Sequence, residues 1–259
     1  MRAYAQKNLY GVDKDSFLAR LGRIRLASLY ETASNIFCAD SLIWDKATLG
    51  EELNRFDVIL TNPPFGSNIS AGSEETLRKF DLAHKFRRRG DQYIDIGSIN
   101  SSIPPQIVFF EQCLRLLKPN GRLGIVIPES MISSSKYGYV TNYLLKNATI
   151  KALVGMPENL FKTSGRGGTH TKTCLLYLEK KEPISRNQIF FAAEAKWCGH
   201  DSRGKSIPND DLPIIKENSL YIVLGDWTRK QSWNVKLIYL TTVEPYWHHV
   251  VLHARWALV

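Results

Sequence analysis

Three short apolar runs near the start of the chain each end in a polar residue, and their spacing constrains the fold more than any other feature. The runs at 9–12, 36–39 and 58–61 are followed by Asp13, Asp40 and Asn62, which are 27 and 22 residues apart. This spacing fits successive strand–helix–strand units, and apolar residues at 14–30 recur at helical intervals. Because parallel strands joined this way end at one edge of a sheet, where ligands of open α/β sheets bind, we expect the three polar residues to line one crevice.

The same alternation continues beyond residue 100 and predicts an α/β fold. A helix is predicted at 104–117, opened by two prolines and stopped by a Pro-Asn-Gly segment. A second helix is predicted at 137–146, and buried strands are predicted at 123–127, 150–154 and 173–178. Helices that connect parallel strands cover the faces of the sheet, so we expect helices on both faces.

The tetrapeptide Asn62-Pro63-Pro64-Phe65 follows the third apolar run and carries the strongest chemical signal. Proline has no backbone N–H, so the carbonyls nearby have few local donors and are available to a ligand. The Asn62 side chain adds another carbonyl acceptor, and Phe65 adds a flat apolar face. Two acceptors beside an aromatic ring suit a planar base that carries an amino group, which predicts a nucleobase-amine site. The alternative is a proline-rich turn.

An excess of positive charge indicates a polyanionic partner. The net charge is +9 and the isoelectric point is near 9.3, which favours nucleic acid. Basic residues gather at 78–89, directly after the tetrapeptide. We expect Arg87, Arg88 and Arg89 to contact the DNA backbone from a loop. The alternative is a solvated loop that binds nothing.

The sequence carries no signal for a membrane span, for secretion or for a metal site. No apolar run is long enough to cross a bilayer, and the first residues lack the apolar stretch of a signal peptide. The four cysteines are far apart and form no Cys-x-x-Cys pair. We therefore expect a cytoplasmic, reduced protein that holds no metal ion.

Asn-Pro-Pro-Phe after a buried strand resembles the catalytic motif of amino-group methyltransferases. The stretch from Leu9 to about Lys180 is similar to the N6-adenine DNA methyltransferase family, especially to the modification subunits of type I restriction-modification systems. The resemblance implies a Rossmann-like sheet, S-adenosylmethionine as the cofactor, and site-specific methylation of adenine N6 in double-stranded DNA. It also implies a separate specificity subunit and a restriction subunit as partners.

The resemblance assigns two carboxylates to the cofactor. Asp13 would hold the ribose hydroxyls, because a carboxylate accepts from two hydroxyls at once. Asp40 would accept from the amino group of the cofactor's adenine. The alternative for each residue is a helix cap or a turn.

The resemblance also assigns the tetrapeptide to a target adenine that has left the duplex. Asn62 and the carbonyl of Pro63 would accept the two N6 hydrogens, within a catalytic motif completed by Pro64 and Phe65. Phe65 and Phe161 would stack on the flipped base. Ordinary core packing is the alternative for Phe161.

One part of the family pattern is absent from the sequence. The family has a Gly-rich loop after its first strand, ahead of the position of Asp13, and only eight residues precede Leu9. We therefore expect a sheet without its first strand, with unpaired strand edges and half a cofactor site, in a chain that is weak or inactive alone. The alternatives are a non-catalytic nucleic-acid-binding or assembly remnant, and a methyltransferase of RNA or of protein glutamine.

Three segments are expected along the chain. Residues 1–181 would form the methyltransferase core, incomplete at its N-terminus, and residues 182–225 a peripheral extension. Residues 226–259 form an atypical tail that contains four of the six tryptophans and does not resemble the family.

Overall fold

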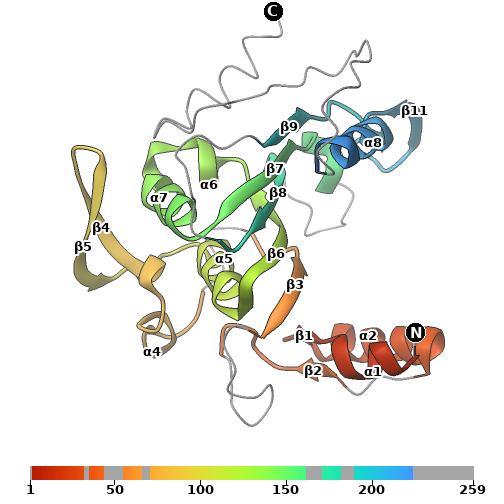
Figure 1. Ribbon diagram of the computed structural model, residues 1–259, viewed down its shortest axis with the longest axis horizontal. Coiled ribbons are helices and arrows are strands. Elements are labelled where there is room, and N and C mark those ends of the chain that lie inside the picture. The colour runs from red at the N-terminus through yellow and green to blue at the C-terminus, as the bar shows by residue number, and fades with distance from the viewer. Residues whose placement is uncertain are drawn as a thin grey trace, which may run out of the picture. The chain divides into compact units, whose positions relative to one another are not determined.

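The computed structural model describes residues 2–31, 35–43, 55–65, 71–161, 171–181 and 190–223 (Figure 1). The chain divides into two compact units, Met1–Glu52 and Leu53–Val259. This division lies inside the segment that we expected to form one core. The tail at 226–259 and residues 182–189 of the peripheral extension lie outside the described residues.

The first unit is built on a two-stranded parallel sheet. Its elements are α1 (Arg2–Asn8), β1 (Gly11–Asp13), α2 (Ser16–Tyr30) and β2 (Ile36–Cys38). β1 pairs with β2 in parallel across α2, which confirms the first predicted strand–helix–strand unit. The carboxylate of Asp15 begins α2 by accepting from the backbone N–H groups of Phe17 and Leu18.

The apolar side of α2 is exposed, although its spacing predicts a helix that faces a core. Phe17, Leu18, Leu21, Ile24 and Leu29 are 49–68% exposed. An apolar helix stripe needs a facing surface to be buried. Two strands of three residues each are too short to cover a helix of 15 residues, so the first unit leaves most of this stripe uncovered.

The second unit contains a five-stranded mixed sheet in the order β3-β6-β8-β7-β9. The strands are β3 (Phe56–Thr61), β6 (Leu117–Pro128), β7 (Thr149–Gly155), β8 (Thr173–Glu179) and β9 (Phe191–Glu194). β8 is antiparallel to both of its neighbours, whereas β3 pairs with β6, and β7 with β9, in parallel. β3, β6, β7 and β9 therefore run in the same direction, and we call the edge where they end the carboxyl edge.

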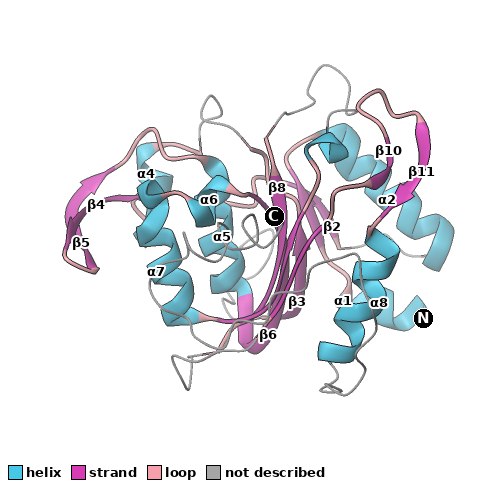
Figure 2. Cartoon of the chain, turned by 90° about the horizontal axis from the view of Figure 1, so that it is seen from above, coloured by secondary structure: helices cyan, strands magenta, loops and turns pink. Residues whose placement is uncertain are grey.

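Helices lie on both faces of this sheet (Figure 2). α5 (Pro105–Leu116) and α7 (Gly138–Asn147) cover one face, and α8 (Leu212–Val223) lies on the other. Phe110 of α5 is fully buried, and Ile215 of α8 packs into a cluster with Val154 and Phe191. The predicted α/β fold is confirmed.

Shorter elements complete the second unit. They are α4 (Glu74–Leu77), η1 (Asp81–Ala83), β4 (His84–Arg89), β5 (Gln92–Ile99), α6 (Ser130–Ser133), η2 (Ser135–Tyr137), η3 (Glu158–Phe161), β10 (Cys198–His200) and β11 (Ser206–Asp210). None of the helices within the described ranges combines the length and the hydropathy that crossing a bilayer requires.

No strand among the described residues joins β1 to β3. β1 pairs with β2, and β3 pairs with β6. Asp13 ends and Asp40 follows a strand of one sheet, and Asn62 follows a strand of another, so the expectation that the three residues line one crevice stays a prediction. On one face of β3, Val58 is 55% and Leu60 81% exposed, so this strand keeps apolar surface that its own unit does not cover.

Candidate functional site

The tetrapeptide Asn62-Pro63-Pro64-Phe65 lies at the carboxyl edge, where β3 ends. β3 holds its place through parallel pairing with β6, which runs as far as Thr61↔Ile125. Asn62 is exposed, Pro63 is buried and Phe65 is half-buried. The buried proline anchors the turn while the amide of Asn62 stays accessible, so the segment can offer acceptors to a ligand.

The two aromatic residues predicted to stack on a base lie side by side. The ring centroids of Phe65 and Phe161 are 6.3 Å apart, with an interplanar angle of 68°. Such an edge-to-face arrangement is favourable for aromatic pairs. Phe161 belongs to η3, which follows β7 at the carboxyl edge, so two segments far apart in sequence bring aromatic faces to the tetrapeptide. Base stacking by these rings remains a prediction.

Asp13 and Asp40 lie together at the ends of neighbouring parallel strands. The backbone N–H of Ala39 donates to the carbonyl of Asp13 at 3.0 Å, which ties the two strand ends. Asp13 Oδ1 accepts from the Asp15 backbone N–H at 2.8 Å, and the cap of α2 is Asp15 instead. Asp40 accepts from the Leu42 backbone N–H at 3.0 Å and from Lys14 Nζ at 3.2 Å. Because a carboxylate has about four acceptor positions, both residues retain capacity to accept from hydroxyl and amino donors, and their binding of a cofactor stays a prediction.

A charged cluster at the carboxyl edge was missed by the sequence analysis. Lys172 Nζ lies 2.5 Å from Glu194 Oε1 and 3.3 Å from Glu129 Oε2. Burial alone would lower the pKa of Lys172, but the hydrogen bonds and charges of Glu194 and Glu129 outweigh it and raise this pKa above its ordinary value. No short sequence spacing links these residues; the end of β6, the start of β8 and the end of β9 bring them together at the carboxyl edge.

The basic segment forms a β-hairpin, and the prediction of a loop was wrong. β4 and β5 pair in antiparallel fashion around the turn Gly90–Asp91, where Gly90 has a φ of 63°. A positive φ in a two-residue hairpin turn is readily adopted by glycine. Arg87, Arg88 and Arg89 are all exposed.

An acid-sensitive contact closes the base of this hairpin. His84 Nδ1 lies 2.5 Å from Asp95 Oδ2. Burial raises the pKa of Asp95, but the hydrogen bonds from His84 and from the Gly97 backbone outweigh it and hold this pKa below its usual value. A carboxylate whose pKa is lowered on folding stabilises the fold above its unfolded pKa, about 4, and loses that contribution as the pH falls through the folded pKa.

We therefore expect Asp95→Asn to lower the melting temperature at pH 6 and to have less effect at pH 3. Thermal unfolding of wild type and variant across this range measures the difference. A difference that stays constant from pH 6 to pH 3 would show that the Asp95 carboxylate contributes no charge-dependent stability.

Comparison with known proteins gives a family for this chain. Residues 2–236 match the family model described as N-6 DNA Methylase. The type II methyltransferase M.VspI of Vibrio sp. (strain 343) is 26% identical over 175 residues, which cover 67% of this chain and 38% of that protein. The methylase subunit of the type I restriction enzyme MpnII from Mycoplasma pneumoniae is 27% identical over 162 residues, which cover 61% of this chain and 27% of that subunit.

Solved structures share the fold. The methyltransferase subunit of a type I restriction-modification system from Streptococcus thermophilus superposes with a TM-score of 0.62 at 19% identity, covering 95% of this chain and 46% of that one. The M protein of the type I restriction enzyme EcoKI gives a TM-score of 0.56 at 14% identity, covering 96% and 57%. The chain thus spans little more than half of these proteins at most. Since the family model matches most of its length, the chain belongs to the N-6 DNA Methylase family.

Proposed function

We propose that the chain transfers a methyl group from S-adenosylmethionine to N6 of an adenine in double-stranded DNA, as part of a restriction-modification system. The observation that carries this proposal is the tetrapeptide at the carboxyl edge, with Phe161 6.3 Å from Phe65. Two acceptors and two aromatic rings together suit a flipped-out base with an amino group. The names of the family and of the relatives in restriction-modification systems support this substrate.

In this proposal Asn62 and Pro63 hold the target nitrogen. The side-chain oxygen of Asn62 and the backbone carbonyl of Pro63 accept the two N6 hydrogens, which draws the nitrogen towards a tetrahedral shape and aims its lone pair. S-adenosylmethionine supplies the methyl group on a sulfonium centre. Positioning provides most of the acceleration, and the extra proton on the methylated nitrogen leaves to water, so the residues need supply no strong base.

The first unit contributes the cofactor half in this proposal. Asp13 would accept from the ribose hydroxyls and Asp40 from the adenine amino group, as their places on adjacent strand ends allow.

We place the DNA-backbone contacts on the β4–β5 hairpin. These contacts add affinity without reading sequence. The relatives named as methylase subunits of type I restriction enzymes support the presence of further subunits, among which a separate specificity subunit would select the site and a restriction subunit would complete the system.

Tritium transfer from labelled S-adenosylmethionine tests the substrate class. Unmethylated plasmid DNA, RNA and a protein mixture are offered separately to an excess of the chain in single-turnover conditions. The proposal predicts label in the plasmid DNA. Label confined to RNA or to protein would contradict it, because the same tetrapeptide would then act on another amino group.

Replacing Phe161 separates base stacking from core packing. Phe161→Ala should lower transfer at limiting DNA concentration by roughly 5- to 150-fold, the equivalent of about 1–3 kcal/mol of stacking per base. Phe161→Leu keeps apolar bulk but removes the flat ring, so stacking predicts that it behaves like the alanine variant. Full rescue by leucine in the same transfer assay would identify Phe161 as a packing residue only.

A further inference from the structure

We propose that the β4–β5 hairpin is a preformed ribbon that binds duplex DNA with one face only, through Arg87 and Arg89 beside Ile94 and Ile96. This inference rests on the proposed function, which supplies DNA as the partner. It limits the predicted contacts with the DNA backbone to one face of the hairpin, and Arg88 is not among the residues that make them.

Strand pairing divides the hairpin into two faces, because residues directly opposite each other share a face and successive residues alternate. The pairs of the first face are Arg87↔Ile94 and Arg89↔Gln92, and those of the second face are Phe86↔Asp95 and Arg88↔Tyr93. Ile96 joins the first face two residues after Ile94. We call the first face the ribbon face.

The second face packs on the start of α7. The rings of Phe86 and Tyr139 stack with centroids 4.8 Å apart and an angle of 16°, and Tyr93 lies 6.5 Å from the same ring. A Cβ on Gly138 would collide with the hydroxyl of Tyr93, so glycine permits this close approach. The hairpin is therefore docked by aromatic contacts and presents the ribbon face outward.

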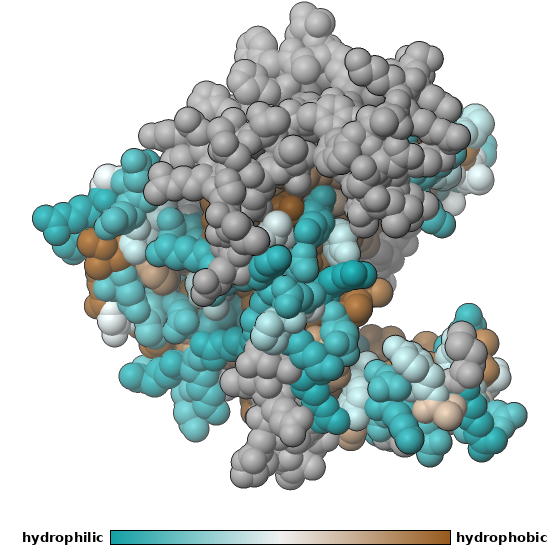
Figure 3. Space-filling model, viewed as in Figure 1, coloured by the Kyte–Doolittle hydropathy of each residue, from teal (hydrophilic) through white to brown (hydrophobic). Residues whose placement is uncertain are grey.

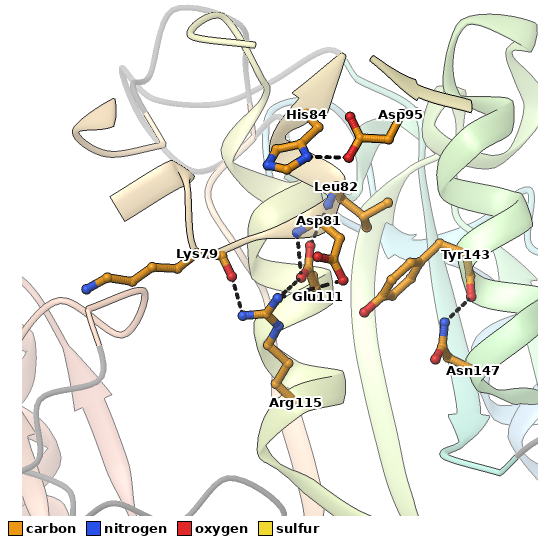
Figure 4. Close-up of polar contacts among 9 residues, drawn as sticks. All are labelled: Lys79, Asp81, Leu82, His84, Asp95, Glu111, Arg115, Tyr143 and Asn147. Carbon is orange, nitrogen blue, oxygen red and sulfur yellow. Dashed lines mark hydrogen bonds and ion pairs between the residues drawn. The ribbon is translucent and has the colours of Figure 1, made fainter. Parts of the chain in front are cut away.

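A buried carboxylate fixes the base of the hairpin to α5 (Figure 4). Glu111, fully buried, accepts from the backbone N–H of Asp81 at 2.9 Å and of Leu82 at 2.7 Å. Arg115 Nη2 lies 2.6 Å from Glu111 Oε1, and Arg115 also donates to the carbonyl of Lys79. η1, which leads directly into β4, is thereby held to the helix at two consecutive residues.

Topology puts the docked hairpin on the side of the tetrapeptide. α7 connects β6 to β7, and these strands run in the same direction because each is antiparallel to β8. A helix that connects two parallel strands starts near the carboxyl end of the first strand. Tyr139 and Gly138 are its first residues, so the hairpin is anchored at the carboxyl edge, where Asn62 also lies.

The chemistry of the ribbon face fits a duplex. Arg87 and Arg89 are exposed, and Ile94 and Ile96 are 42% and 48% exposed. The pairs of this face include no carboxylate, since Asp95 belongs to the other face. Figure 3, in the same view as Figure 1, shows a mostly hydrophilic surface with a hydrophobic strip where the hairpin projects at the left. The two arginines complement the phosphates of a duplex, and the apolar strip complements the thymine methyl groups in the major groove. That groove is wide enough to admit a two-stranded ribbon.

Arg88 is engaged differently. Its Nε donates to the carbonyl of Gly90 at 2.9 Å, within the hairpin turn, and it shares the face that packs on α7. Arg88→Ala is therefore a matched control for the other two arginines, since it removes the same charge from the same strand.

Fluorescence anisotropy tests the inference. A labelled 30-base-pair duplex is titrated with the full chain at several salt concentrations, and the affinity is measured at each. Each phosphate contact contributes about 0.9 to the slope of log affinity against log salt. Arg87→Ala and Arg89→Ala should therefore each reduce that slope by about 0.9, and the double variant by about 1.8, whereas Arg88→Ala should leave the slope as in wild type. Thermal unfolding checks that all variants stay folded.

The outcomes separate this inference from the proposed function. If wild type binds the duplex but the double variant and Arg88→Ala give equal salt slopes, the proposed ribbon is overturned. The proposed methyltransferase function is not affected by this result. A wild-type chain that shows no salt-dependent binding would also overturn the ribbon, and methyl transfer to plasmid DNA then decides the proposed function on its own.

Discussion

Replacing Asn62 with alanine is expected to lower methyl transfer to DNA roughly 100-fold or more, because misplacing a reacting group by about 1 Å costs that much. The variant retains the carbonyl of Pro63 but loses the side-chain acceptor that holds the second N6 hydrogen. Asn62 is exposed, so its removal should leave the fold intact, and exposed substitutions usually change stability by no more than about 0.5 kcal/mol. Single-turnover transfer of labelled methyl groups to unmethylated plasmid DNA measures the effect.

Asn209→Ala provides the matched control for this experiment. Asn209 is also an exposed asparagine, on β11, and the account gives it no part in transfer. Wild-type rates for Asn209→Ala and a large loss for Asn62→Ala are expected. Transfer by Asn62→Ala at the wild-type rate would remove Asn62 from the catalytic motif.

Glu111→Ala should give the largest loss of stability, roughly 3–5 kcal/mol in the free energy of unfolding. The substitution leaves the backbone N–H groups of Asp81 and of buried Leu82 without this acceptor and removes the partner of Arg115. Burial raises the pKa of Glu111 above its ordinary value, an effect that the Leu82 N–H and the charge of Arg115 only partly offset, so the carboxylate depends on these partners. Chemical denaturation followed by circular dichroism measures the change.

Two further variants sharpen the Glu111 prediction. Glu111→Gln keeps an acceptor oxygen and should lose less stability than alanine. Glu75→Ala, on α4 and exposed, should change stability by no more than about 0.5 kcal/mol. If Glu111→Ala unfolds at the same denaturant concentration as Glu75→Ala, the contacts of Glu111 with η1 do not hold the base of the hairpin.

The strand ends were predictable because their signals are local. An apolar run followed by Asp13 or Asn62 marks a strand and its end, and β1 and β3 end at or next to these residues. The helix after Pro104 was predictable for the same reason, since proline opens α5. The pairing of Phe65 with Phe161 came from the family resemblance, not from any spacing in the sequence.

Other features depend on tertiary contacts that no local pattern reveals. The four residues at 86–89 are all basic or aromatic, so the sequence shows no alternation of apolar and polar side chains along β4. The pairing with β5 determines which of these side chains share a face. Glu111 sits at helical spacing from Arg115, a common surface pattern, yet it is fully buried because η1 covers it. The exposed stripe of α2 was predicted to face a core because sequence periodicity does not report how much sheet lies opposite.

The position of the new methyl group shows whether the tetrapeptide holds an adenine amino group. Plasmid DNA that lacks adenine methylation is incubated with excess chain and S-adenosylmethionine, digested to nucleosides and analysed by mass spectrometry. The account predicts N6-methyldeoxyadenosine with wild type and its near absence with Asn62→Ala. Methylated cytosine in its place, or no methylated nucleoside from a chain that binds both the cofactor and DNA, would contradict the claim that the tetrapeptide holds an adenine amino group for transfer.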